Sequence, residues 1–109
     1  MNADQKKMYK LMADVISAAG HEIRLAILDY LNNGEQCVCD IAEYVGANRS
    51  NVSRHLTVML NAGLVAQRKD GLKMMYSLRT PCILNITKCV LGVLKQRTAE
   101  TSEILESLK

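Results

Sequence analysis

The chain has 109 residues, of which 49% are hydrophobic and 23% charged, a composition that suits one compact domain and leaves no room for two. It excludes a disordered tail protein, because the apolar fraction is large enough to build a core. The net charge of +3 is unevenly spread. Residues 46–79 carry six basic residues and one acidic residue, whereas residues 20–45 carry one basic and five acidic residues. A basic segment such as residues 46–79 is typical of a surface that binds a polyanion.

The first residues contain no long apolar run, because charged residues such as Asp4, Lys10 and Asp14 interrupt it. We therefore expect neither a signal peptide nor a membrane span, and a cytoplasmic location. In that compartment the four cysteines indicate metal ligands, redox sensors or buried core residues rather than structural disulfides.

Hydrophobic periodicity predicts four helices in the first part of the chain. Apolar residues recur at helical spacing, and glycines or Asn-Gly stretches mark the ends of the segments. The predicted helices cover residues 8–19, 23–31, 40–45 and 48–61.

The pattern changes after residue 63. Residues 64–68 and 73–78 are strand-like and flank an Asp-Gly turn, which predicts a β-hairpin. Pro81 then begins a last helix that we expect to run to about Leu94, since the missing N–H of proline costs little in a first turn. Residues 98–103 are polar and are expected to fray, and the apolar residues from 104 to 108 can add another turn or two.

These elements predict a mainly α-helical winged helix-turn-helix with a small β-hairpin wing, in one DNA-binding domain over residues 1–109. The helix-turn-helix occupies residues 38–63 and the wing residues 64–79. We expect residues 1–19 and 82–109 to be dimerisation helices, because both carry apolar stripes wider than one small core can use. The protein is then dimeric through its N- and C-terminal helices.

Residues 48–56 begin the second helix of the pair. Val52 and Leu56 face inward, which leaves a polar face free for base edges and phosphates. Asparagine can pair with adenine and arginine with guanine; the alternative is a solvated face on which Ser50 only caps the helix. Together with the bases of the hairpin, the predicted DNA-binding set is Arg49, Ser50, Asn51, Ser53, Arg54, His55, Arg68, Lys69 and Lys73.

Four stretches resemble consecutive signatures of the ArsR/SmtB family of bacterial and archaeal metalloregulators. They are HEIRLAILDYL, GEQCVCDIAEYVG, NVSRHLTVMLNAGLV and RKDGLKMMYSL, in that order. The resemblance implies a homodimeric winged-helix repressor that binds double-stranded operator DNA near its own promoter. It also implies release from DNA when an effector binds, commonly a metal or metalloid and sometimes a reactive sulfur species.

The resemblance points to Cys37 and Cys39 as metal ligands. In the arsenite-, antimonite- and cadmium/lead-responsive branches of the family, a Cys-Val-Cys motif at this position supplies thiolates. One arsenic-responsive subgroup has a third cysteine where this chain has Ala42, so a third ligand must come from elsewhere. The ligands of the zinc-responsive branch are Asp and His on the last helix, and this chain has Thr80, Cys82 and Val93 at the nearest positions.

The spacing of the cysteines limits what they can bind. Residues i and i+2 of a helix point about 200° apart, so Cys37 and Cys39 can share an ion only in an extended or irregular segment; the alternative is that both are buried apolar residues. Cys82 and Cys89 lie about 10 Å apart along the last helix, beyond the reach of a disulfide. Either of them is a possible third ligand, or packs in the dimer interface. His21 is most simply a cap or surface residue.

The leading hypothesis is a repressor that leaves its operator when As(III), or otherwise Sb(III), Cd(II) or Pb(II), binds cysteine thiolates. The first alternative is a redox or reactive-sulfur sensor of the same fold, in which the cysteines become linked to one another. The second is a winged-helix module that docks other proteins without an effector. No catalytic triad, paired catalytic carboxylates or phosphate-binding loop stands out, so we expect no enzyme activity and no organic cofactor.

Overall fold

The computed structural model of the chain describes residues 1–97 and 99–108. It is mainly helical, with a small three-stranded antiparallel sheet. In chain order the elements are α1 (Ala3–Ala19), α2 (Glu22–Leu31), β1 (Gln36–Cys37), α3 (Val38–Val45), α4 (Arg49–Asn61), β2 (Val65–Asp70), β3 (Lys73–Leu78), α5 (Ile83–Lys95) and α6 (Ala99–Ser107). Two short helices followed by a hairpin confirm the predicted winged helix-turn-helix.

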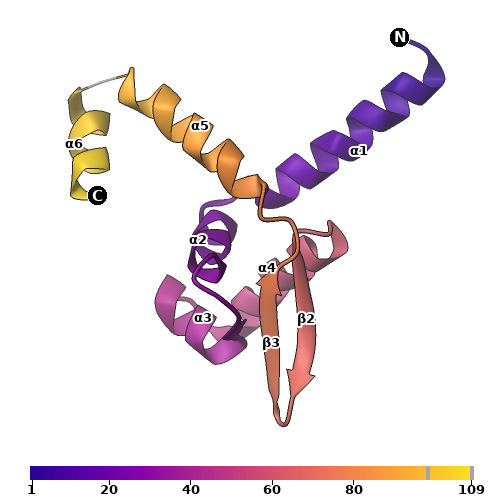
Figure 1. The fold of residues 1–109 in the computed structure, drawn as a ribbon, viewed down its shortest axis with the longest axis vertical. Helices are drawn as coiled ribbons and strands as arrows, with labels where there is room; N and C mark the ends of the chain where they lie inside the picture. Colours follow the sequence, from indigo (N-terminus) through magenta and orange to yellow (C-terminus); the bar gives the residue numbers. More distant parts are fainter. Residues whose placement is uncertain (98, 109) are drawn as a thin grey trace.

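The core lies where α2, α3 and α4 pack against one another and against the sheet (Figure 1). Its largest fully buried side chains are Ile27, Leu28, Ile41, Val52, Leu56, Met59, Leu64 and Val65. A buried side chain of this size contributes roughly 1.5–3 kcal/mol relative to its exposed state. The core therefore fixes α4 through one face and leaves its opposite face at the surface.

The sheet joins the wing to the segment that precedes α3. Its strand order is β1-β3-β2, and β1 pairs with β3 through Cys37 opposite Met75. The hairpin turns at Gly71, whose φ of 62° is in the left-handed region that favours glycine. The prediction contained β2 and β3 but missed β1, because a strand of two residues shows no alternation.

Three predicted helix starts were wrong. Helix α1 begins at Ala3 rather than at residue 8, because Asn2 caps it there. Helix α3 begins at Val38, two residues earlier than expected, because Cys37 ends β1 and is itself the residue that precedes the helix. Helix α5 begins at Ile83 rather than at Pro81. Beyond it the chain forms a separate helix, α6, where fraying was expected; position 98 lies outside the described residues. None of the described helices is both long and apolar enough to cross a membrane.

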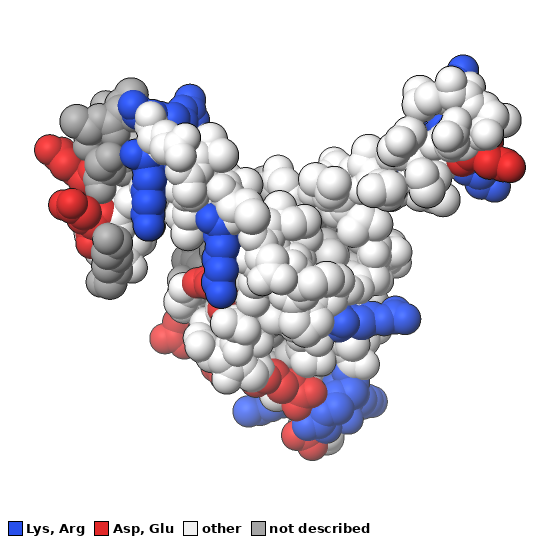
Figure 2. Space-filling model, turned by 45° about the horizontal axis from the view of Figure 1, so that its top comes forward, with Lys and Arg blue, Asp and Glu red and all other residues white. Residues whose placement is uncertain are grey.

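Helices α1 and α5 project from the core body in different directions (Figure 1). Both expose many large apolar side chains: Met8, Tyr9, Leu11, Met12 and Ile16 on α1, and Ile86, Val90, Leu91 and Val93 on α5. Figure 2 shows an uncharged surface along most of the α1 arm, whereas Lys and Arg side chains interrupt the surface of the α5 arm. Apolar surface of this extent is typical of an interaction site rather than of a solvated helix.

Candidate nucleic-acid interface and thiol site

The turn between α3 and α4 holds the start of α4 in place. Gly46 ends α3 with φ 69°, and its N–H donates to the carbonyl of Ala42. Asn48 then caps α4, because its Oδ1 accepts the backbone N–H of Asn51 at 2.8 Å. The sequence alternative in which Ser50 caps this helix is therefore wrong. The known preference for Asn at this position was a signal that could have identified the cap.

One face of α4 is exposed and polar. Val52, Leu56 and Met59 are buried, and the opposite side of the first two turns is free. Five of the six DNA-binding residues predicted on this helix lie exposed there: Arg49, Ser50, Asn51, Ser53 and Arg54. A helix N-terminus that carries such side chains can enter the major groove and donate to base edges and phosphates.

His55, the sixth predicted residue, is half-buried and packs against His21. Their ring centroids lie 4.5 Å apart. Burial lowers the pKa of His55, and the nearby His21 and Arg24 lower it further. His21 caps α2, as predicted, because its Nδ1 accepts the N–H of Ile23 at 3.1 Å. His55 thus contacts His21 instead of lying fully exposed on α4, and it supplies less positive charge than an exposed histidine.

The three predicted bases of the wing are in two different situations. Lys69 and Lys73 are exposed beside the turn. Arg68 instead donates from Nε and Nη2 to the carboxylate of Glu35, at 2.7 and 2.6 Å. This pair lowers the pKa of Glu35 and raises that of Arg68. The charge of Arg68 is therefore balanced within the chain, whereas the two lysines can face a phosphate without giving up such a partner.

The predicted thiol pair lies at the junction of these elements. Cys37 is buried and has an extended backbone (φ −84°, ψ 162°) ahead of α3, to which its side chain gives no capping hydrogen bond. Cys39 is half-buried in the first turn of α3, and Nη2 of Arg49 donates to its Sγ. One thiol therefore touches the sheet and core, and the other touches the first residue of α4.

The predicted third ligand is not brought to this pair within one chain. Cys82 precedes α5 and Cys89 lies on it, and both are exposed free thiols. Cys37 pairs with Met75, and the three residues from there to the end of β3 already span about 10 Å. Among the residues that the structure describes, no three His, Cys, Asp or Glu side chains are grouped so that they could hold a metal ion.

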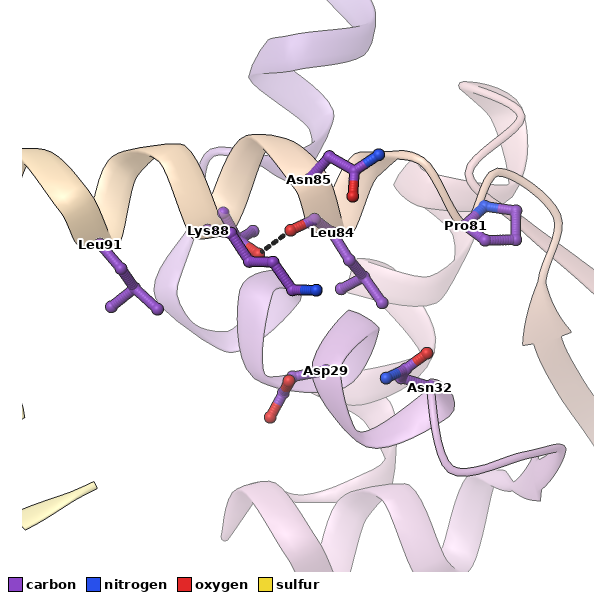
Figure 3. A pocket seen from close by; sticks show the side chains of 8 residues that line it. Asp29, Asn32, Pro81, Leu84, Asn85, Lys88 and Leu91 are labelled. Atoms are coloured by element: carbon purple, nitrogen blue, oxygen red, sulfur yellow. Dashed lines mark hydrogen bonds between the residues drawn. The ribbon is translucent and has the colours of Figure 1, made fainter. Parts of the chain in front are cut away.

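A pocket of about 360 Å³ lies between the end of α2 and the start of α5 (Figure 3). Asp29 and Asn32 line it from α2, and Asn85 and Lys88 from α5. No cysteine lines this pocket. It is therefore separate from the thiol pair, and no pattern in the sequence indicated it.

The chain is similar to known transcriptional regulators. The family model described as bacterial regulatory protein, arsR family, matches residues 21–67. An HTH-type transcriptional regulator of Mycobacterium tuberculosis is 32% identical over 107 residues, which are 97% of this chain and 94% of that protein. An arsenical resistance operon repressor of Staphylococcus xylosus is 36% identical over 70 residues, 64% of this chain and 67% of that protein.

A solved structure shows the same architecture. It is the homodimeric winged helix-turn-helix DNA-binding domain of a possible ArsR-family regulator from Mycobacterium bovis, 28% identical, with a TM-score of 0.74 over 85% of this chain and 86% of that one. The resemblance drawn from the sequence motifs is therefore confirmed by independent comparison. This chain belongs to the arsR family of bacterial regulatory proteins.

Proposed function

We propose that this protein is a homodimeric repressor that leaves its operator when As(III) or another soft ion binds Cys37 and Cys39. The observation that carries the proposal is the position of the thiols at the start of α3, with Cys39 in contact with Arg49 at the start of α4. A ligand on these sulfurs acts directly beside the helix that carries the DNA-reading face.

The dimer forms through α1 and α5. The exposed apolar side chains of both helices support this arrangement, and so does the homodimeric state of the similar M. bovis domain. A winged domain also needs two copies to contact two half-sites one helical turn apart. Sedimentation at micromolar concentration is expected to give a dimer, and a monomer would contradict this part of the proposal.

Operator DNA is read by the exposed face of α4, with Arg54, Arg49 and Asn51 on base edges and Ser50 and Ser53 on phosphates. Lys69 and Lys73 of the wing bind phosphates on either side of the groove. Because the phosphate contacts release counterions, the affinity falls as salt rises. Binding that shows no preference for the protein's own promoter over random DNA would contradict the repressor function.

As(III) is soft and takes sulfur ligands. Each As–S bond forms as a thiol gives up its proton and one hydroxyl of arsenous acid leaves as water. Cys37 and Cys39 are the obligatory pair, and a third sulfur comes from Cys82 or Cys89 of the partner subunit. Sb(III), Cd(II) and Pb(II) are alternative effectors of the same site. The similarity to an arsenical resistance operon repressor favours As(III).

Binding both sulfurs to one ion requires a change at the start of α3. Cys37 is buried beside the sheet whereas Cys39 reaches toward Arg49, and no side-chain cap holds the first turn of this helix. Because α3 packs against α4, a changed α3 displaces the reading face. The expected coupling between ion and DNA binding is about 1–3 kcal/mol, roughly 5- to 150-fold in affinity.

The test is release of a fluorescent operator duplex by arsenite, followed by anisotropy, with the bound ion counted by native mass spectrometry. Cys37→Ser and Cys39→Ser are expected to abolish release while the dimer remains. Cys82→Ser and Cys89→Ser identify the third ligand: the variant of the ligand is expected to weaken release, and the other variant serves as the matched control. A full response in both variants of the pair would contradict the model, and loss only in the α5 variants would move the sensor there.

The second candidate is a reactive-sulfur or redox sensor. The observation that favours it is that all four cysteines are free thiols and that two of them are exposed, Cys82 directly before α5 and Cys89 on it. Persulfide treatment would then change the protein mass through sulfur addition or cysteine linkage and would release DNA without any ion. A protein-docking module is less well supported, because the exposed face of α4 carries residues suited to DNA.

A further inference from the structure

Arg49 is held between two helices. It is the first residue of α4, directly after the Asn48 cap, and its side chain donates from Nη2 to Cys39 Sγ on α3. The backbone at this point is fixed by the cap hydrogen bond of 2.8 Å. The side chain is long and exposed, so the sulfur contact is the interaction that restricts its direction.

The contact leaves most of the guanidinium free. An arginine side chain has five N–H donors in a fixed planar fork, and the sulfur accepts one of them. The remaining donors can pair with a base edge or a phosphate. A guanidinium that is already oriented loses less freedom when it binds DNA than one that is unrestrained.

Cys39 is itself placed by the sheet. Cys37, two residues earlier, pairs with Met75 in β3, so the first turn of α3 starts from a fixed strand. The wing, the start of α3 and the guanidinium of Arg49 are thereby connected through three successive residues.

We propose that Cys39 is a positioning residue for DNA recognition, which orients the Arg49 guanidinium toward the operator in the absence of any effector. This inference rests on the proposed operator binding and not on the identity of the ion. It also gives the thiol site a direct route to DNA, because any ligand on the Cys39 sulfur removes or displaces the partner of Arg49.

A double-mutant cycle without effector tests the inference, with operator affinity as the readout. Cys39→Ala is expected to weaken operator binding about three- to tenfold, the size of one lost hydrogen bond. Cys39→Ser is expected to stay within about twofold of the wild type, because a hydroxyl oxygen accepts the same N–H. In the Arg49→Ala background, Cys39→Ala is expected to have almost no further effect.

Arg54→Ala is the matched control, because Arg54 lies on the same exposed face without a thiol partner in the structure. In that background Cys39→Ala should cost as much as in the wild type. General destabilisation of α3 would lower affinity equally in both arginine backgrounds, so the cycle separates positioning from misfolding. Equal losses in both backgrounds, together with selective operator binding by the wild type, would overturn this inference alone. Wild-type protein without operator preference would overturn the proposed function as well.

Discussion

The two helices of the helix-turn-helix begin in different ways. Helix α4 follows a left-handed glycine and is capped by Asn48, and its inner face is fully buried. Helix α3 begins at Val38, directly after Cys37, whose side chain forms no capping hydrogen bond. It is held instead by the short strand before it and by the contact between Cys39 and Arg49.

Under the proposed function, the two helix starts have different tasks. A side-chain cap is worth about 1 kcal/mol, so the first turn of α3 is less restrained than that of α4. Recognition of a base sequence requires side chains in fixed positions, whereas a sensor requires a segment that can change. The thiol pair lies on the less restrained helix start, and the reading face on the more restrained one.

The largest expected effect comes from truncating a buried side chain on the inner face of α4. Leu56 is fully buried, and Leu56→Ala should lower the free energy of unfolding by about 2–5 kcal/mol, through lost burial and the cavity that remains. Urea unfolding followed by circular dichroism measures the loss. Val58→Ala on the exposed side of the same helix is the control and should change stability by less than about 0.5 kcal/mol. Similar losses in both variants would show that α4 is not anchored through this face.

The next effect concerns the reading face itself. Arg54→Ala should weaken operator binding by about 1–3 kcal/mol and relax preference at the base pair that it contacts, while stability stays unchanged because the side chain is exposed. Competition between operator and random duplexes, at a fixed salt concentration, measures both quantities. An equal loss on operator and random DNA would mean that Arg54 contacts phosphate only.

The difference between the helix starts can be tested at the cap. Asn48→Ala should cost about 1 kcal/mol of stability, and Asn48→Asp should retain most of it because a carboxylate accepts the same N–H. Ser50→Ala should leave stability within about 0.5 kcal/mol, since Ser50 lies inside the helix. Thermal unfolding of the three variants, compared with the wild type, measures these changes in stability. A larger loss in Ser50→Ala than in Asn48→Ala would reverse the assignment of the cap.

The sequence predicted the elements that carry their own local signal. The periodicity of α1, α2 and α4 and the Asp-Gly turn of the wing were sufficient to place them, and Val52 and Leu56 correctly indicated the inner face of α4. Strand β1 could not be predicted, because its two residues are strand-like only through their pairing with β3, almost forty residues later.

Contacts between distant residues were equally inaccessible. The pairs Glu35–Arg68 and Cys39–Arg49 depend on how β1 meets the wing and how α3 crosses α4. No local pattern contains that information. The sequence analysis therefore named Arg68 and Cys39 as candidate site residues, but it contained neither the ion pair of Arg68 with Glu35 nor the contact of Cys39 with Arg49.

A smaller effect distinguishes the bases of the wing. Lys69→Ala should reduce the slope of log affinity against log salt by about 1, because an uncompensated charge near a phosphate is lost. Arg68→Ala should reduce it less, because Glu35 already balances that charge in the free protein. Glu35→Gln tests the same ion pair from the other side. It removes the acidic partner of Arg68 and should strengthen binding to all duplexes alike. Equal slopes for the two alanine variants would show that the ion pair opens on DNA.

The smallest expected effect is the pH dependence of stability that His55 of α4 contributes. Burial, together with His21 and Arg24, lowers the pKa of His55, so the folded protein binds this proton less readily than the unfolded chain does. The stability contributed by neutral His55 is therefore complete above the ordinary histidine pKa of about 6.5 and is lost as the pH falls through and below that value. Histidine proton shifts between pH 8 and 5 should show His55 titrating below an unstructured histidine. His21→Asn, which keeps an acceptor at the α2 cap, should move the pKa of His55 upward, and an unchanged value would leave burial and Arg24 as the remaining causes.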